Sequence, residues 1–199
     1  DTYNYMVNKI NKLLEEQEKS AREVRKSEFK ALQSQINPHF LYNTLDMIRW
    51  LSNKGDHEKV STAIQSLSKF YKLTLNKGNI TVSLKEELEH VSLYVTLQNM
   101  RYEDNINFII DAPDELLDYK VPKLILQPIV ENSIQHGIFG KESKKGTIII
   151  MWWIEEDMVV LTISDDGIGM PMDKVKNILN GKGESSSGNN IAIYNTHRR

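Results

Sequence analysis

A proline at position 38, followed directly by a histidine, divides the N-terminal helical pattern of this 199-residue chain. Proline fixes its own φ and has no backbone N–H, so a helix arriving from residue 36 must bend or restart there. A restart places Pro38 in the first helical turn, with Asn37 as the expected N-cap. His39 then also lies in this first turn. The sequence thus predicts separate helical segments before and after Pro38.

Residues 1–36 repeat apolar positions with a period of about 3.5 residues. The two rows of the seam are Val7, Leu14 and Ala21, and Ile10, Gln17 and Val24. This pattern predicts a parallel two-stranded coiled coil, and therefore a homodimer, with a break in phase at Glu28. A single amphipathic helix packed on its own domain is the alternative.

Two apolar stripes at helical spacing follow Pro38, separated by a turn at residues 53–56. The first stripe is Leu41, Leu45 and Ile48, and the second is Val60, Ile64, Leu67, Tyr71 and Leu75. We expect an antiparallel helical hairpin over residues 37–78, and a four-helix bundle where two hairpins of a dimer meet. His39 lies off the stripe, so its ring is expected to face solvent.

Residues 79–199 read as a second domain of mixed helices and strands, which predicts an α+β fold with helices on one face of a sheet. Ser83 and Glu86 form a capping box before a helix with a buried side. That side is Leu84, Leu88, Val91, Val95 and Gln98. A strand is predicted at 106–110, a helix at about 123–136, and a β-hairpin from strands 147–154 and 158–163. Of Trp152 and Trp153, one should be core and one surface.

The composition excludes several classes of protein. The chain is 40% hydrophobic and 26% charged with a net charge of -2, and its basic residues form no dominant stripe, so no nucleic-acid partner is expected. It has no cysteine, which excludes disulfides and thiolate metal sites. No apolar run approaches the roughly 18 residues of a membrane span. Its histidines form no i, i+4 pair, which argues against a histidine-based metalloenzyme.

Two segments of the second domain carry residues suited to nucleotide chemistry. ISDDGIGM, residues 163–170, leaves a strand with two acids and then has Gly167 and Gly169 around one apolar residue. Glycines permit close approach or positive φ, and an acid can accept a hydrogen bond from an exocyclic amine. LILQPIVENSIQHG, residues 124–137, places polar side chains in an apolar helix, where an oxygen ligand for Mg²⁺ lies beside a carboxylate. An acidic turn and a solvent-facing helix side remain the simpler explanations of either segment alone.

Together with NPHFLYN at residues 37–43, these motifs resemble the cytoplasmic part of a sensor histidine kinase whose ATP-binding half belongs to the GHKL superfamily. The resemblance covers roughly residues 33–199. It implies a dimerisation and phosphoacceptor hairpin at 37–78 and an α/β sandwich of the GHKL or Bergerat type at 79–199, and the coiled coil predicted at 1–36 would then be a signalling helix. It further implies ATP and Mg²⁺ as cofactors and a response regulator as the protein partner.

The resemblance also implies a role for individual residues. His39 is the phosphorylated residue, and Asn43 orients the water that removes phosphate from the partner. Asn132 is the Mg²⁺-binding asparagine of the N box, and Glu131 is the acid before it. The expected adenine-binding acid is Asp166. The remaining residues expected at the nucleotide are Gln135, His136, Gly167, Gly169 and Asn195.

The chain departs from the family pattern at three places. Phe40 follows the histidine where an acid is usual, Gln135 stands where a lysine is common, and residues 190–195 read NIAIYN instead of GxGLxN. The family would also add a helix and closing strands after Arg199. The main expectation is a protein-histidine kinase that phosphorylates itself and then an aspartate of the regulator. The alternative is a non-catalytic dimeric signalling scaffold. Either is expected to be the cytoplasmic portion of a bacterial membrane protein, attached through segments absent from this chain.

Overall fold

The computed structural model describes residue 17 and residues 37–75, 81–102, 105–156 and 158–179. Two compact units, residues 1–41 and 42–199, are described separately. The predicted coiled coil lies outside the described residues except for Gln17, as do residues 180–199 with the second glycine box and Asn195. The predicted domain limits at 36/37 and 78/79 therefore stay predictions.

Helix α2 spans Pro38–Asn53 and begins at the predicted proline. The side-chain oxygen of Asn37 accepts a hydrogen bond from the Phe40 N–H at 3.2 Å, and its carbonyl accepts from Leu41 N–H at 3.1 Å. Asn37 thus satisfies a donor that the helix cannot satisfy itself. His39 is exposed. The predicted helix start at Pro38, the cap and the exposure of the histidine are confirmed, whereas the predicted helical segment directly before Pro38 lies outside the described residues.

Helix α3 spans His57–Thr74, follows a turn in which Gly55 has φ +77°, and is capped by the Asp56 side chain. The apolar stripes predicted for α2 and α3 do not form the core of the single chain: Leu45 is 48% exposed and Ile64 51% exposed. The residues buried instead are Phe40, Thr44, Met47 and Leu51 on α2, and Ala63, Ser66, Phe70 and Thr74 on α3. The smaller, more polar side of α3 is buried because it is the side that packs on the next helix.

Helix α4 spans Leu84–Arg101 and opens with the predicted capping box. The Ser83 hydroxyl accepts from Glu86 N–H at 3.2 Å, and the Glu86 carboxylate accepts from Ser83 N–H at 3.0 Å. Every residue of the predicted stripe is buried. A second buried row, Glu87, His90, Tyr94 and Leu97, was not predicted. On this row His90 stacks on Phe70 of α3 at 4.4 Å between ring centroids, so α4 is enclosed on more than one side.

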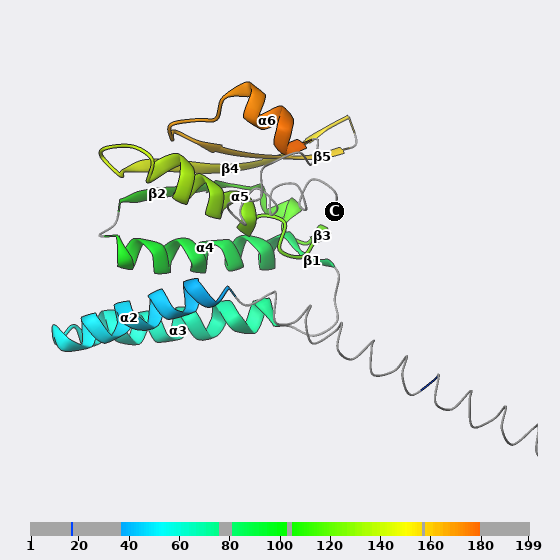
Figure 1. The fold of residues 1–199 in the computed structure, drawn as a ribbon. Helices are drawn as coiled ribbons and strands as arrows, with labels where there is room; N and C mark the ends of the chain where they lie inside the picture. The colour runs from blue at the N-terminus through cyan, green and yellow to red at the C-terminus, as the bar shows by residue number, and fades with distance from the viewer. Residues whose placement is uncertain (1–16, 18–36, 76–80, 103–104, 157, 180–199) are drawn as a thin grey trace, which may run out of the picture. The chain divides into compact units, whose positions relative to one another are not determined.

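The main sheet has the order β2-β4-β5, from Ile106–Asp111, Gly146–Glu155 and Met158–Asp165. Strand β2 pairs parallel to β4, and β4 pairs antiparallel to β5 with Glu155 opposite Met158, as the predicted hairpin requires. Helix α4 and the later helix α5 lie along one face of this sheet (Figure 1). Trp152 is 5% exposed and Trp153 38% exposed, which confirms one core and one surface tryptophan. The α+β class is confirmed.

The remaining elements are short. Strands β1 (Thr81–Ser83) and β3 (Lys120–Pro122) form an antiparallel pair that sequence patterning missed, and η1 (Asp114–Leu116) is a 3-10 turn. Helix α5 (Gln127–Asn132) continues directly into a π-helical segment, η2 (Ser133–Ile138), and α6 covers Met172–Leu179. The helix predicted from residue 123 starts later, because Leu124 has φ +59° and cannot be helical.

Candidate functional site

The polar residues predicted for nucleotide binding lie along the continuous α5–η2 helix. Glu131 and Asn132 are half-buried on the last turn of α5, Gln135 is half-buried on η2, and His136 is exposed. The Gln135 amide donates to the Glu131 carboxylate at 3.2 Å. Burial raises the pKa of Glu131 while the bond from Gln135 opposes that rise. The π-helical turn widens the backbone spiral here, a distortion that is frequent at functional sites.

Two buried side chains of α4 support this helix from inside. The Tyr94 hydroxyl, in a side chain that is 1% exposed, accepts a hydrogen bond from Gln98 at 2.7 Å. Burial raises the pKa of Tyr94, the charge of Glu131 adds to the rise, and bonds from Gln98 and Gln135 oppose it. Tyr94 and Gln98 therefore share one polar cluster with Glu131 and Gln135. Sequence reasoning missed Tyr94, although its place in a row of polar residues at helical spacing was a usable signal.

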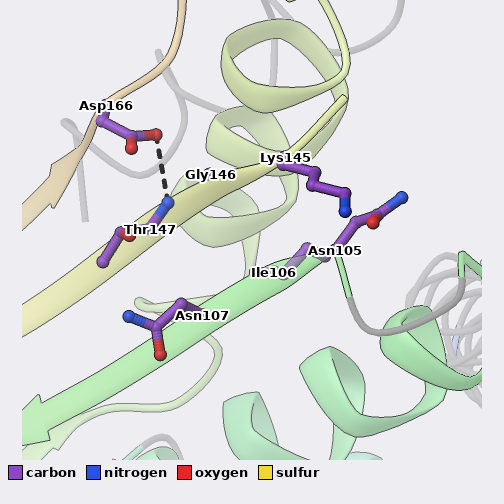
Figure 2. Close-up of a pocket in the computed structure, with 7 residues that line it drawn as sticks. All are labelled: Asn105, Ile106, Asn107, Lys145, Gly146, Thr147 and Asp166. Atoms are coloured by element: carbon purple, nitrogen blue, oxygen red, sulfur yellow. Dashed lines mark hydrogen bonds between the residues drawn. The ribbon is translucent and has the colours of Figure 1, made fainter. Parts of the chain in front are cut away.

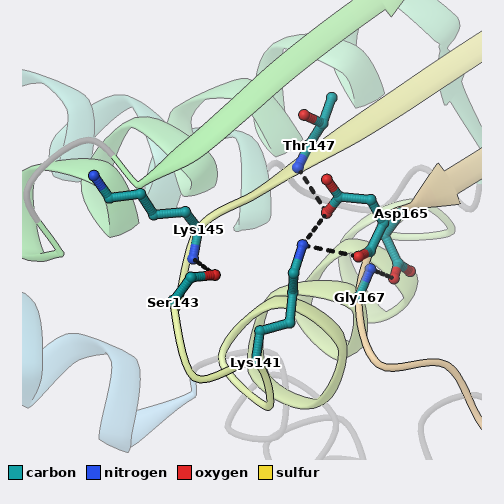
Figure 3. Close-up of polar contacts among 7 residues, drawn as sticks. Lys141, Ser143, Lys145, Thr147, Asp165 and Gly167 are labelled. Carbon is teal, nitrogen blue, oxygen red and sulfur yellow. Dashed lines mark hydrogen bonds and ion pairs between the residues drawn. The ribbon is translucent and has the colours of Figure 1, made fainter.

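The glycine-containing turn after β5 lies directly against the end of η2. The Asp165 carboxylate accepts from Gly167 N–H at 3.0 Å (Figure 3), and Ile168 N–H donates to the Gly137 carbonyl at 3.1 Å. A Cβ atom on Gly167 would lie 2.4 Å from the Gly137 backbone, and one on Gly137 would lie 2.7 Å from the Asp165 carboxylate. Gly169 has φ +71°. Gly167 is thus required for close approach and Gly169 for its conformation.

The two acids of this turn point to different places. Asp165 pairs across the strands with Ile148, which is fully buried, so it lies on the sheet face that packs against the helices. Asp166 follows the strand and is held by Lys141 Nζ and by Thr147 N–H, each at 3.0 Å. These two donors, Thr147 first, lower the pKa of Asp166. Asp165 therefore lies against Gly137 of η2, whereas Asp166 is held at the start of β4.

Asp166 instead lines an open surface recess of about 480 Å³ at the beginning of β2 and β4 (Figure 2). Its other lining residues are Asn105, Ile106, Asn107, Lys145, Gly146 and Thr147. No residue of α5 or η2 lines this recess. Asp166 thus lines this recess, whereas Asp165, which sequence reasoning did not single out, lies against Gly137 at the η2 helix. The alternation of side chains along β5 was the signal that separates the two acids.

His39 belongs to the first unit, and the described residues predicted for nucleotide binding belong to the second. Asn43 is half-buried on α2. Among the described residues, no group of three or more histidines and acids is placed to hold a metal ion by itself. None of the described helices is long and apolar enough to cross a membrane.

Two family models match consecutive parts of the chain. Residues 27–106 match the histidine kinase model, and residues 118–198 match the model for ATPases like those of histidine kinases, DNA gyrase B and HSP90. The first match contains His39, and the second contains the α5–η2 helix and the glycine turn. The boundary between the matches falls after α4.

Curated relatives agree with this division. The sensor histidine kinase YesM of Bacillus subtilis is 34% identical over 99% of this chain and 33% of its own length. The sensor protein LytS of Oceanobacillus iheyensis is 36% identical over 92% of this chain and 32% of its own. The sensor protein kinase HptS of Staphylococcus aureus is 31% identical over 80% of this chain and 30% of its own length. The chain spans about a third of the length of these relatives. The chain belongs to the sensor histidine kinases that carry an ATPase region of the GHKL kind.

Proposed function

We propose that this chain is the kinase region of a two-component sensor, which phosphorylates His39 from Mg·ATP and passes the phosphoryl group to an aspartate of a response regulator. The observation that carries the proposal is the contact between the glycine turn and the end of the α5–η2 helix. This contact brings an acid suited to adenine, Asp165, against the helix that carries Asn132.

The donor set fits a magnesium nucleotide. A carboxylate at the end of a strand accepts a hydrogen bond from the adenine amine, the role we assign to Asp165 in place of Asp166. Mg²⁺ in nucleotide sites takes one or two protein oxygens, with phosphates and water completing the shell. The Asn132 side-chain oxygen meets that need, and Gln135, His136 and Asn195 belong to the same proposed site. Glu131, held by Gln135, supplies the negative charge beside Asn132.

His39 supplies the nucleophile. Its neutral imidazole has one nitrogen without a hydrogen, and that nitrogen forms the new N–P bond. Bound Mg·ATP supplies the γ-phosphoryl group; its bond to the bridging oxygen breaks and ADP leaves. The proton on the other ring nitrogen is released. An exposed position at the start of a helix leaves the imidazole open to both the nucleotide and the regulator. Asn43 is proposed to orient water when the phosphate is removed from the regulator.

The proposal includes a homodimer. Large apolar side chains remain exposed on the hairpin: Tyr42, Leu45, Trp50 and Ile64. Exposed groups of this size are usual at surfaces that meet a partner. Two hairpins joined through these residues give the expected four-helix bundle. The expected place of this region, the cytoplasmic portion of a membrane protein, is part of the same proposal.

Radiolabelled Mg·ATP tests the phosphoacceptor. The wild-type chain should acquire a label that is lost in acid and survives in base, because protonating a phosphoramidate makes its nitrogen a better leaving group. His39→Gln should acquire none, with an unchanged circular dichroism spectrum because the side chain is exposed. An acid-stable label, or full labelling of His39→Gln, contradicts the proposal.

Calorimetric titration with Mg·ATP separates a kinase from a scaffold that has lost nucleotide binding. Asp165→Asn should abolish measurable binding, whereas Asp166→Asn should retain it, because Asp165 lies against Gly137 of η2 and Asp166 is held by Lys141 and Thr147. Retained binding in Asp165→Asn together with loss in Asp166→Asn would restore the role expected for Asp166. A wild-type chain that binds no nucleotide would support the scaffold.

A further inference from the structure

The loop before α5 has a conformation that needs external support. Leu124 has φ +59°, a region that residues with a Cβ atom rarely adopt. The loop does not form helical hydrogen bonds of its own for the N–H groups of Leu124, Ile125 and Leu126. All three point to one side chain on another helix, the carboxylate of Glu87 on α4.

Glu87 holds this loop with both oxygens. Leu124 N–H donates to Oε1 at 2.6 Å, and Ile125 and Leu126 N–H donate to Oε2 at 3.0 and 3.3 Å. The side chain is buried, with 2% of the residue exposed. A charge-assisted acceptor with three backbone donors is among the strongest arrangements available to a buried carboxylate. Glu87 belongs to the buried row of α4 that the apolar pattern did not reveal.

The same bonds fix where α5 begins. The Leu126 N–H is bound to Glu87, while the Leu126 carbonyl accepts from Ile129 N–H at 3.2 Å and Val130 N–H at 3.0 Å. The peptide groups on both sides of Leu126 are therefore held, one by Glu87 and one by the helix. At about 1.5 Å per residue, Asn132 lies only about 9 Å further along the helix axis. A displacement of the first turn is carried to Asn132 by the rigid helix.

The charge of Glu87 is also compensated. Burial raises the pKa of Glu87, whereas the three N–H groups and the positive charge of Lys123 oppose that rise. The Lys123 ammonium donates to the carbonyl of Thr74 at 2.7 Å, which keeps the cation beside the loop. Three donors and a neighbouring cation favour the ionised form that the geometry requires.

We propose that Glu87 is a positioning residue for the nucleotide site: its carboxylate sets the start of α5 and thereby places Asn132 for the magnesium ion. This inference deepens the proposed function and rests on it. Glu87 does not touch the nucleotide in this scheme. It acts through the backbone of residues 124–126, so its loss should weaken the Mg²⁺-dependent part of nucleotide binding in particular.

The test is calorimetric titration of the 199-residue chain with ATP, once in Mg²⁺ and once in EDTA. In Glu87→Gln one acceptor oxygen becomes an NH₂ donor that faces backbone N–H groups. The affinity for Mg·ATP should fall by about tenfold. This is the lower end of the loss in affinity that follows when a contact supporting a metal site is removed. Affinity for ATP in EDTA should stay within about twofold of wild type, since Asp165 is on a separate strand.

Glu86→Gln is the matched control. It removes the neighbouring carboxylate of the same helix, and glutamine still completes a capping box, so Mg·ATP affinity should stay within about twofold of wild type. Equal losses with and without Mg²⁺ in Glu87→Gln, or no loss, would overturn the positioning role. If Glu87→Gln does not fold, Glu87→Asp carries the same measurement, because it keeps the charge but withdraws the oxygens by one methylene.

A rescue variant separates positioning from a general loss of stability. Leu124→Gly removes the cost of the left-handed conformation, so the loop depends less on Glu87. Combined with Glu87→Gln, it should recover a large part of the lost Mg·ATP affinity, and no recovery contradicts the inference. A wild-type chain that fails to bind Mg·ATP removes the proposed function and this inference together. Loss in Asn132→Ala with wild-type binding in Glu87→Gln removes only the role of Glu87.

Discussion

Helix α4 and the α2–α3 hairpin differ in the large apolar side chains that they leave exposed. Helix α4 buries polar side chains, among them Glu87, His90 and Gln98, and gives each a hydrogen-bond partner inside the unit. The hairpin leaves large apolar side chains exposed, among them Trp50 and Ile64. Burial of hydrogen-bonded polar groups specifies a single packing arrangement of the helix, whereas large exposed apolar groups are typical of surfaces that bind a partner. The difference indicates that α4 contributes to the interior of the second unit, while the hairpin leaves exposed the apolar surface that the proposed homodimer would cover.

The largest expected effect tests the interior of α4. Leu97 is 2% exposed, and Leu97→Ala should lower the free energy of unfolding by about 3 kcal/mol, as truncation of a buried leucine usually does. Urea denaturation followed by circular dichroism measures this loss. A loss near zero would show that α4 is not enclosed and would remove the contrast with the hairpin.

The next effect concerns the buried histidine that joins α4 to α3. The Thr74 hydroxyl donates to the Phe70 carbonyl, so the His90 Nε2–H donates to Thr74, and the buried Nδ1 has no partner among the described residues. Burial, with the positive charge of Lys123, lowers the pKa of His90 from 6.5 to about 4. Glu86, Glu87 and Lys123 line the small cavity beside its ring.

The sign of the pH effect follows from that lowered pKa. Below pH 6.5 this histidine is protonated in the unfolded chain, whereas in the folded chain it stays neutral until the pH falls to about 4. Stability should therefore fall as the pH drops through this window, with His90 accounting for about 2 kcal/mol between pH 7 and pH 5. Urea denaturation at several pH values should show a shallower fall in His90→Gln. An identical pH dependence in both proteins would mean that His90 is not buried as a neutral ring.

The helix start gives a smaller effect. Ser83→Ala removes the hydroxyl that accepts from Glu86 N–H and should cost about 1 kcal/mol of unfolding free energy. Ser83→Asp keeps an acceptor at the same place and serves as the control. If both variants lose the same stability, the capping bond contributes little and the cost lies in the β1–β3 pair, where Ser83 faces Lys120.

The smallest effect on folding is expected on the hairpin. Ile64 is 51% exposed, so Ile64→Ala should change the unfolding free energy of the isolated chain by less than about 0.5 kcal/mol. The same variant should weaken self-association measured by sedimentation equilibrium. Unchanged association together with a large loss of folding stability would reverse the comparison, since the hairpin stripe would then belong to the core of the single chain.

Local signals predicted much of this structure. Pro38 and Asn37 fix the start of α2, the Ser83–Glu86 pair fixes the start of α4, and the β-branched strands with their acidic turn fix the β4–β5 hairpin. These features depend on residues close in sequence. The sequence does not distinguish the two neighbouring acids Asp165 and Asp166, because only the register of β5 shows that Asp165 is on the sheet face that packs against the helices.

Long-range contacts explain what sequence patterning missed. The start of α5 was placed too early because the apolar run continues through Leu124, whose backbone is held out of the helix by Glu87. The second buried row of α4 contains polar residues, so a search for apolar periodicity does not detect it. The apolar stripe of the hairpin is visible in the sequence, but the pattern alone does not show whether residues of the same chain or of a second chain cover it.

The contact between Gly137 and Gly167 has a consequence for how this site can change over generations. A side chain at Gly167 would collide with the Gly137 backbone, and one at Gly137 would collide with the Asp165 carboxylate, so a change at either position must shift the helix and the turn relative to each other. Substitutions in the α5–η2 helix and in the glycine turn are therefore coupled, although the two lie in different parts of the chain. A library that randomises both positions should yield functional clones in which the glycines persist as a pair, and new nucleotide specificities should be sought among their neighbours.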